Sequence, residues 1–258
     1  MVILEENREY NSVIGAADAP YINSLAQQYV LSTNWFGVHH PSLPNYLALI
    51  SGSTQGINDD GTGYVFNGTN LADQLSNAGI SWKAYMEDMP SPCDNTGGTA
   101  GYAKKHDPFM YFSDITSNPA RCNRVVPFTQ FNSDLTSNTA PNFMWVTPNL
   151  CNDGHDCGNN VVDGWLQSEM AVIQGSQWYA QGGKVIITYD EGDTGGGLNG
   201  TDGGHIVTIT VSNANKGHGQ NAASGDHYGT LRAIEEAYGL GLLAGAADAR
   251  NGDLRTTF

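Results

Sequence analysis

The stretch HHPSLPNYLALISG, residues 39–52, places two histidines and a proline-flanked serine directly before an apolar run. A serine often begins a helix as its N-cap, because its oxygen accepts a hydrogen bond from a free amide of the first turn, and proline is favoured just inside the start. The same helix start favours an anion, so Ser42 could also act as a nucleophile toward phosphate. The local pattern favours the cap, and the rest of the sequence must decide between the two roles.

Two pairs of oxygen-bearing side chains, Glu6–Asn7 and Asp190–Glu191, each follow a short apolar run. Carboxylate and amide oxygens are hard ligands, which suit Mg²⁺, Ca²⁺ or Mn²⁺ better than copper and leave Zn²⁺ possible. Any one of these side chains alone would more often be a solvated residue or a helix cap. Together they predict a divalent metal site. Such a metal could lower the pKa of the Ser42 hydroxyl and neutralise charge on a transferred phosphoryl group.

The elements that would position these residues alternate between strand and helix. Buried-strand patterns cover residues 1–7, 29–36, 81–87, 142–148, 184–192 and 205–212, and amphipathic helix patterns cover residues 17–29, 43–51, 70–80, 160–177 and 227–240. This alternation predicts an α/β fold, a three-layer sandwich with a mostly parallel central sheet.

In open, mostly parallel sheets, functional groups gather at the carboxyl ends of the strands. Several of the predicted strands end in side chains of metal-ligand or acid–base type. These side chains are Glu6 and Asn7, then His39, His40 and Ser42, then Asn149, Asp153, His155 and Asp156, and finally Asp190 and Glu191. The pattern therefore predicts that all of them lie along one edge of the sheet.

Length and charge limit the classes of protein that this chain can belong to. We expect a single domain over residues 1–258, with an irregular insertion at about 88–126, because 258 residues suffice for one full core and no linker-like segment divides them. Eleven basic and 26 acidic residues give a formal charge of −15, which repels nucleic acid and anionic membrane surfaces. Because few Lys or Arg are available for an anionic substrate, a bound metal cation is expected.

Four cysteines form an even set without C-x-x-C pairs, which argues against a zinc knuckle. The simplest arrangement is two disulfides, Cys93–Cys122 and Cys151–Cys157, in a secreted or periplasmic protein, and free buried thiols are the alternative. No 18-residue apolar run occurs, so we expect no membrane-spanning segment and no stable membrane association. No leader peptide is visible, since Met1 opens directly into a predicted strand, and this start suggests a trimmed chain.

Six motifs, in order along nearly the whole chain, resemble those of the bacterial and fungal phosphoesterase family. They are EN at 6–7, HPSLPNY at 40–46, KKHDPF at 104–109, NLCNDGHD at 149–156, TYDEG at 188–192 and DHYGTLRAIEEAYGL at 226–240. That family contains acid phosphatases and phosphatidylcholine-type phospholipases C, and it belongs to the alkaline phosphatase superfamily. The resemblance implies an alkaline-phosphatase-like fold for this chain.

The resemblance also implies a role for each matching residue. Ser42 matches the nucleophile that forms a phosphoseryl intermediate, and Asn45, one helical turn on, resembles a residue that contacts a nonbridging phosphate oxygen. The implied metal ligands are Glu6, Asn7, Ser42, Asp190 and Glu191. The groups implied to hold the phosphate or protonate the leaving oxygen are His155, Asp153 and Asp156, and the further substrate-binding candidates in matching motifs are His40, His106 and His227.

At two places this sequence differs from the motifs of related enzymes, and these differences limit the number of metal ions and the type of ester that we expect. Alkaline phosphatases carry a second metal on an Asp-x-x-x-His motif, whereas NLCNDGHD has Asn149 and Asp153 at that spacing. We therefore expect one divalent metal ion, Mg, Ca, Mn or Zn, with side chains covering the other half of the phosphate. Sulfatases use a C/S-x-P-S-R setting, and HPSLPNY lacks the arginine, so sulfate ester cleavage is not expected.

The leading hypothesis is a secreted, metal-dependent phosphatase that hydrolyses small phosphate monoesters through a phosphoserine intermediate. A phospholipase C-type phosphodiesterase is the alternative, ranked lower because the chain is short and has no obvious apolar lid. A non-catalytic glycan-binding module that uses the 12 Tyr and 5 Trp is a third hypothesis. A conventional serine hydrolase is weaker still, because no G-x-S-x-G motif occurs. The oligomeric state leaves no signal in the sequence.

Overall fold

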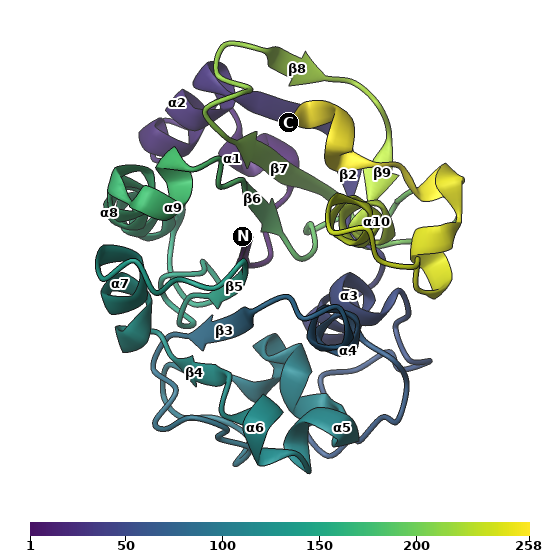
Figure 1. Ribbon diagram of the computed structural model, residues 1–258. Coiled ribbons are helices and arrows are strands. Elements are labelled where there is room, and N and C mark those ends of the chain that lie inside the picture. Colours follow the sequence, from purple (N-terminus) through teal and green to yellow (C-terminus); the bar gives the residue numbers. More distant parts are fainter.

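One nine-stranded sheet runs through the molecule (Figure 1). The computed structural model describes all residues from Met1 to Phe258. The strands are β1 Val2–Glu5, β2 Val30–Phe36, β3 Trp82–Met86, β4 Val125–Pro127, β5 Phe143–Thr147, β6 Val185–Tyr189, β7 His205–Val211, β8 Gly219–Asn221 and β9 Gly225–Asp226. They are ordered β4-β3-β5-β1-β6-β7-β2-β8, and β9 pairs with β2.

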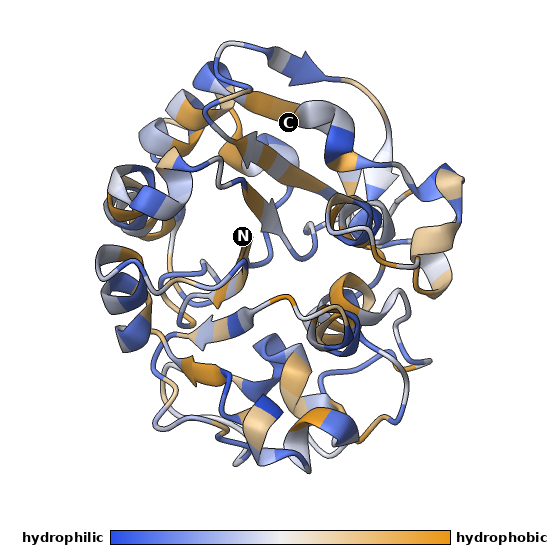
Figure 2. Cartoon of the chain, viewed as in Figure 1, coloured by the Kyte–Doolittle hydropathy of each residue, from blue (hydrophilic) through white to orange (hydrophobic).

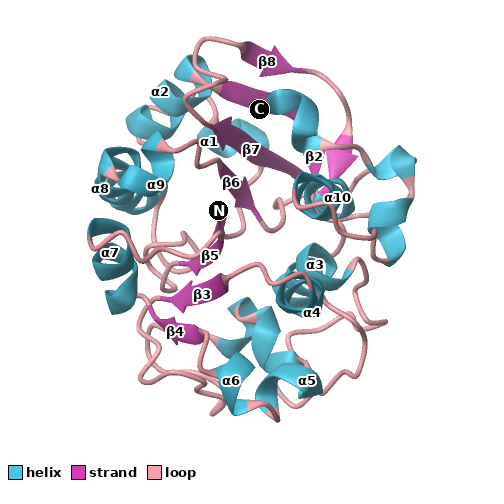
Figure 3. Ribbon diagram, in the orientation of Figure 1, coloured by secondary structure: helices cyan, strands magenta, loops and turns pink.

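Helices cover both faces of this sheet (Figures 1 and 3), with α3, α4 and α10 on one side and α2, α7, α8 and α9 on the other. The α-helices are α1 Tyr10–Val13, α2 Pro20–Gln28, α3 Ser42–Ser51, α4 Leu71–Asn77, α5 Ser113–Thr116, α6 Pro119–Cys122, α7 Thr129–Thr136, α8 Asn159–Gly175, α9 Gln177–Ala180 and α10 His227–Ala237. Short 3-10 helices are η1 Lys104–His106, η2 Pro108–Tyr111, η3 Ala244–Ala247, η4 Ala249–Asn251 and η5 Leu254–Thr257. This arrangement is the predicted three-layer α/β sandwich.

Strand direction decides which loops meet at the same edge of the sheet. All neighbouring pairs are parallel except those that β7 makes with β6 and β2. Because β7 is antiparallel to both of its neighbours, β2 runs in the same direction as β1, β5 and β6. The segments that follow these four strands therefore lie at one edge, as the sequence predicts.

The core explains why the central strands read as continuous apolar runs. Every residue of β1, β5 and β6 is buried, since helices cover both faces of the sheet. Figure 2 shows the apolar residues concentrated on the strands and on the inward sides of the helices. The large side chains Trp35, Trp82 and Trp145 are among the most buried in the chain. This packed centre holds the strand ends in fixed relative positions.

The predicted elements are present, with their ends shifted by a few residues. The sequence patterns missed several short elements, among them α7, β4 and β8, which have eight, three and three residues. The insertion at 88–126 contains η1, η2, α5, α6 and the first residues of β4. Both predicted disulfides, Cys93–Cys122 and Cys151–Cys157, are confirmed. None of the helices combines the length and hydropathy that a membrane crossing requires.

Gly52 ends the helix that begins at Ser42, and we predict that Gly52→Ala destabilises the protein. The backbone has φ +69 there, and a Cβ would lie 2.2 Å from the carbonyl oxygen of Leu243. Gly79→Ala is the matched control, because Gly79 has φ +72 but open space around it. Both variants carry the left-handed strain, and the added clash should cost Gly52→Ala about 1–3 kcal/mol more in the free energy of unfolding. Urea denaturation measures the difference, and equal losses would contradict the prediction.

Candidate active site

Ser42 is the first residue of α3 and its side chain points into a cluster of acids. Its Oγ lies 3.0 Å from Glu6 Oε2 and 3.3 Å from Glu191 Oε1. The residue is only 1% exposed. It makes no capping bond; instead, the amide of Leu43 donates to Asp60 Oδ1 at 2.9 Å. The capping hypothesis for Ser42 is therefore wrong, because its hydroxyl faces two carboxylates and the helix start is bonded by another residue.

Strand register brings the two acidic pairs together. In the parallel pair β1–β6, Glu5 is opposite Tyr189, so the residues that follow each strand are neighbours. The amide of Asp190 donates to the carbonyl of Glu5 at 2.9 Å, and the amide of Asn7 donates to Asp190 Oδ1 at 3.1 Å. Two segments more than 180 residues apart in the chain therefore deliver their polar ends to one place.

The cluster has an excess of buried negative charge. Burial, then Asp190 and Asp153, raise the pKa of Glu6 well above its ordinary value. Burial and the neighbouring Glu191 do the same to the pKa of Asp190. Burial, then Asp60, raise the pKa of Glu191 to about 8. These carboxylates repel one another in a site that water hardly reaches, so a cation placed between them would be strongly favoured.

The residues present fit such a cation. Asn7 Oδ1 and Asp190 Oδ2 are buried without any hydrogen-bond partner, a costly state for a polar oxygen. Asn7 also has φ +35, a left-handed conformation that asparagine tolerates better than most residues. With Glu6 and Glu191 these oxygens form a hard donor set suited to Mg²⁺, Ca²⁺ or Mn²⁺. The four side chains could hold the metal ion that the sequence predicts.

Two histidines border the acids, and each lies beside a second carboxylate. His106 Nδ1 lies 3.3 Å from Asp153 Oδ2, and its Nε2 lies 3.3 Å from Glu6 Oε1. His155 Nδ1 lies 2.7 Å from Asp156 Oδ1. Burial lowers the pKa of His106 well below its ordinary value, so this ring is neutral. The ligand atoms of Glu6, His106 and His155 lie within 4.8 Å of one another, which makes them a second group able to hold a metal.

The remaining predicted residues contact the site in different ways. His40 Nδ1 pairs with Glu191 Oε2, directly beside Ser42. The side-chain amide of Asn45 forms hydrogen bonds with main-chain atoms. Its Oδ1 accepts from Val38 N at 2.8 Å, and its Nδ2 donates to His39 O at 2.7 Å. Asn45 thus holds the loop before α3, and a contact with phosphate would have to replace one of these bonds.

His227, the first residue of α10, is fully buried behind the second acidic pair. Its Nε2 contacts the main-chain carbonyl of Asp190, and its Nδ1 has no partner. Burial lowers the pKa of this histidine to about 4. The buried ring therefore contacts the main chain at the second acidic pair, Asp190–Glu191, which is consistent with its location in a matching motif.

Sequence reasoning missed three residues of the site. The hydroxyl of Tyr46 donates to Glu6 Oε1, and its ring is stacked on His106. Lys105 Nζ lies 3.0 Å from Asp60 Oδ2 and 3.1 Å from His155 Nε2. Two of them could be identified from the sequence, since Tyr46 follows Ser42 by one helical turn and Lys105 lies inside the KKHDPF motif. Asp60 lies in a polar loop, where no sequence feature points to the site.

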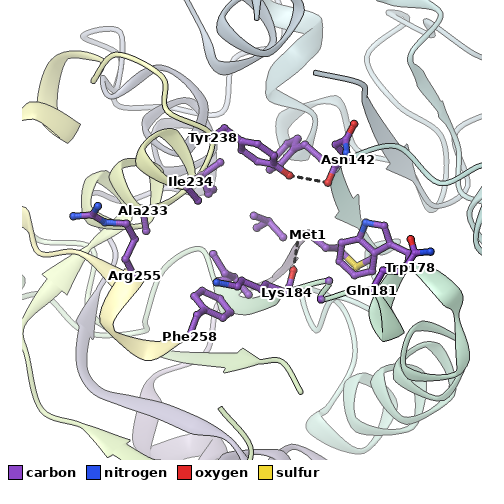
Figure 4. A pocket seen from close by; sticks show the side chains of 16 residues that line it. Met1, Asn142, Trp178, Gln181, Lys184, Ala233, Ile234, Tyr238, Arg255 and Phe258 are labelled. Atoms are coloured by element: carbon purple, nitrogen blue, oxygen red, sulfur yellow. Dashed lines mark hydrogen bonds between the residues drawn. The ribbon is translucent and has the colours of Figure 1, made fainter. Parts of the chain in front are cut away.

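A cavity of about 510 Å³ lies at the other end of the strands, away from these residues (Figure 4). It is lined mainly by apolar and aromatic side chains, among them Trp178, Tyr238 and Phe258, around Met1 and Lys184. The Met1 amine donates to the carbonyl of Lys184 at 2.8 Å. None of the predicted site residues lines this cavity. The candidate chemistry therefore lies in the acidic cluster at the carboxyl edge.

The family model described as "Phosphoesterase family" matches residues 15–241. The chain belongs to this family. A phosphate-repressible acid phosphatase of Penicillium chrysogenum is 34% identical over 179 residues, covering 67% of this chain and 43% of that protein. An acid phosphatase of Aspergillus fumigatus is 30% identical over 197 residues, which cover 73% of this chain and 43% of that protein. A phosphatidylinositol-3-phosphatase of Mycobacterium tuberculosis is 33% identical over 196 residues, covering 75% and 63%.

This phosphoesterase-family chain spans less than half the length of those fungal relatives. Solved structures place its fold among alkaline-phosphatase-superfamily proteins. A superfamily member from Vibrio parahaemolyticus has a TM-score of 0.63 at 12% identity, covering 99% of this chain and 69% of that one. A phosphonate monoester hydrolase of Agrobacterium radiobacter has a TM-score of 0.59 at 14% identity, and the match covers 98% of this chain and 77% of that one. At such identities the likeness concerns the fold, which agrees with the predicted alkaline-phosphatase-like sandwich.

We predict that a divalent cation stabilises the protein through the oxygen cluster. Addition of Mn²⁺ after chelation should raise the melting temperature by on the order of 5 °C, because a ligand that binds only the folded state adds to stability. Asp190→Asn should lose most of this rise. Asp134→Asn should keep it, since Asp134 pairs with Lys83 far from the cluster. Differential scanning calorimetry gives the readout, and equal responses in both variants would disprove a cation site at Asp190.

Proposed function

We propose that this chain hydrolyses phosphate monoesters, with Ser42 as the nucleophile. The proposal is carried by one observation, that the Ser42 hydroxyl lies at a helix start between two buried carboxylates from different strands. A capping or merely structural serine has no need of two acids. Membership of the phosphoesterase family and the acid phosphatases among the relatives support the same reaction.

In the first step, Ser42 Oγ attacks phosphorus in line with the leaving oxygen. The hydroxyl proton passes to the Glu6 or Glu191 carboxylate, which lie within reach of it. A bond from Oγ to phosphorus forms while the ester bond from phosphorus to the leaving oxygen breaks. The leaving oxygen takes up a proton on the side of His155 and Asp153, the groups that the family resemblance implies for this task.

In the second step, water attacks the phosphoserine and releases inorganic phosphate. The water loses a proton to a base on the side where the alcohol departed, and Ser42 Oγ takes back a proton from the adjacent carboxylate. The serine, the carboxylates and the histidine side return to their starting states. The net reaction consumes one water and yields one alcohol and one phosphate.

We infer that one divalent cation belongs to this machinery, held by Glu6, Asn7, Asp190 and Glu191 together with Ser42. When bound, such a cation lowers the pKa of a hydroxyl beside it and neutralises charge on the phosphoryl group. The chain's own contribution is to fix the donor oxygens on the ends of β1 and β6, and to hold the serine through Tyr46 and Glu6 at the start of α3.

The relatives and the location of the aromatic residues support the proposed substrate class. The relatives' names point to phosphate monoesters, either small esters or a phosphorylated lipid head group. A glycan-binding function has little support, because three of the five tryptophans, Trp35, Trp82 and Trp145, are in the core. The two disulfides favour an exported protein, since such bonds persist in oxidising compartments.

Ser42→Ala tests the proposal directly. We expect the release of phosphate from an aryl phosphate monoester to fall by roughly 10³-fold or more, since the nucleophile is removed. Ser51→Ala is the control: Ser51 is buried at the other end of the same helix and bonds the carbonyl of Leu47. It should retain activity within about threefold, as substitutions outside the reacting groups usually do.

A trapping measurement accompanies the kinetics. Acid quench of the wild-type enzyme during turnover, followed by peptide mass spectrometry, should find a phosphoryl group on the peptide that contains Ser42. Wild-type turnover by Ser42→Ala, or a phosphoryl group found only on another residue, would overturn the proposed nucleophile.

A further inference from the structure

The substrate of the proposed function is an anion, and the site that must receive it is acidic. A phosphate monoester carries up to two negative charges, and the groups around Ser42 are Glu6, Asp190, Glu191 and Asp153. One divalent cation would offset only part of this charge. Some fixed positive charge of the chain is needed at the phosphate for binding to be favourable.

Few of the eleven Lys and Arg residues are placed to supply it. Arg8 lies near the site, but its guanidinium donates to the carbonyls of Asn7, Gly154 and Cys157. Lys104 donates to the carbonyl of Thr62 at 2.8 Å and lies over the ring of Tyr111. Lys105 is therefore the one basic residue whose charged atom bonds side chains of the candidate site.

The ammonium of Lys105 has a donor to spare. It has three hydrogens, and two of them are directed to Asp60 Oδ2 at 3.0 Å and to His155 Nε2 at 3.1 Å. The Lys105 side chain is 20% exposed, and neither contact uses the third hydrogen. Asp60 is itself fixed, because its other oxygen accepts from the amide of Leu43, next to the nucleophile. The chain thus holds a charged amine close to Ser42.

We propose that Lys105 is the phosphate-binding cation of this site and that it favours dianionic monoesters over monoanionic diesters. The inference rests on the proposed function. A monoester has one more negative oxygen than a diester, and a charge-assisted hydrogen bond from an ammonium to that oxygen stabilises it more than a neutral partner could. Removal of Lys105 should therefore weaken phosphate binding and lower the preference for monoesters.

Lys105 also acts as a positioning residue for His155. A lysine ammonium can only donate, so before substrate binds His155 Nε2 accepts from it and Nδ1 is directed to Asp156. The histidine is thereby fixed in one orientation. A substrate that takes over the Lys105 contact would release Nε2 toward the leaving oxygen. Loss of the ammonium would free the ring as well as remove the charge.

The test measures the binding of inorganic phosphate to the Mg²⁺-loaded protein by titration calorimetry, which needs no turnover. Lys105→Met, which keeps the stem and removes the charge, should bind phosphate about 10- to 100-fold more weakly. Lys105→Arg should lie closer to the wild type than Lys105→Met. Lys104→Met is the matched control from the neighbouring position and should bind phosphate within about twofold of the wild type.

A second readout is the ratio of kcat/KM for an aryl phosphate monoester to that for the matching diester. Lys105→Met should lower this ratio by about tenfold or more, because only the monoester loses a charged contact. Circular dichroism and melting temperature check the fold of each variant. If Lys105→Met does not fold, Lys105→Gln, which keeps hydrogen-bond donors toward Asp60 and His155, replaces it in both measurements.

The outcomes separate this inference from the proposed function. Unchanged phosphate affinity and an unchanged ester ratio in a folded Lys105 variant would overturn the role of Lys105 while leaving Ser42 as the nucleophile. Absence of phosphate binding to the wild-type protein would overturn it as well. Wild-type protein that binds phosphate through Lys105 but hydrolyses no ester would instead refute the proposed function.

Discussion

Buried negative charge around a single hydroxyl is the constraint on which the rest of this structure depends. Glu6, Asp190 and Glu191 meet at Ser42 with less than a tenth of each residue exposed. Carboxylates in such a place repel one another, and unpaired they would bind protons rather than stay ionised. The arrangement is costly to the fold, and such costs are typically retained at functional sites. A cation and a phosphoryl group are the partners that would use it.

The fold provides the rigidity that this cluster requires. The apolar strands β1 and β6 lie side by side in the middle of the sheet, covered by helices on both faces. Their register sets the acidic pairs next to each other, and α3 carries the serine to the same edge. On the outer side, Asp60 and Lys105 bond the helix start and His155, so the charged groups are connected by hydrogen bonds rather than held by loops alone.

The sequence could predict the residues that follow directly after apolar strands. That Glu6, Asn7, Asp190 and Glu191 lie together can be predicted, because the end of a buried parallel strand has a clear pattern, namely a hydrophobic run followed by polar residues. The role of Ser42 is ambiguous in the sequence, because helix caps and nucleophiles share the same local pattern. Only the tertiary contacts of its hydroxyl, with Glu6 and Glu191, exclude a capping role. Asp60 and Lys105 could not be found in this way, since their partners come from segments whose approach depends on the folding of irregular loops.

The same limit applies to Asn45 and to the short elements. The bonds from Asn45 to the main chain of Val38 and His39 arise from the shape of the loop before α3, which no periodicity describes. Elements such as β8 contribute few apolar contacts, so their sequences resemble loops. The two disulfides could be predicted from neighbouring positions in the sequence, because pairing of adjacent cysteines closes short segments with little rearrangement of the chain.

Anomalous diffraction from crystals grown with Mn²⁺ would locate the metal ion itself. We expect a peak within metal–ligand distance of Ser42 Oγ and of oxygens from Glu6, Asp190 and Glu191. A peak found only among Glu6, His106 and His155, or no peak near Ser42 at saturating Mn²⁺, would contradict this expectation.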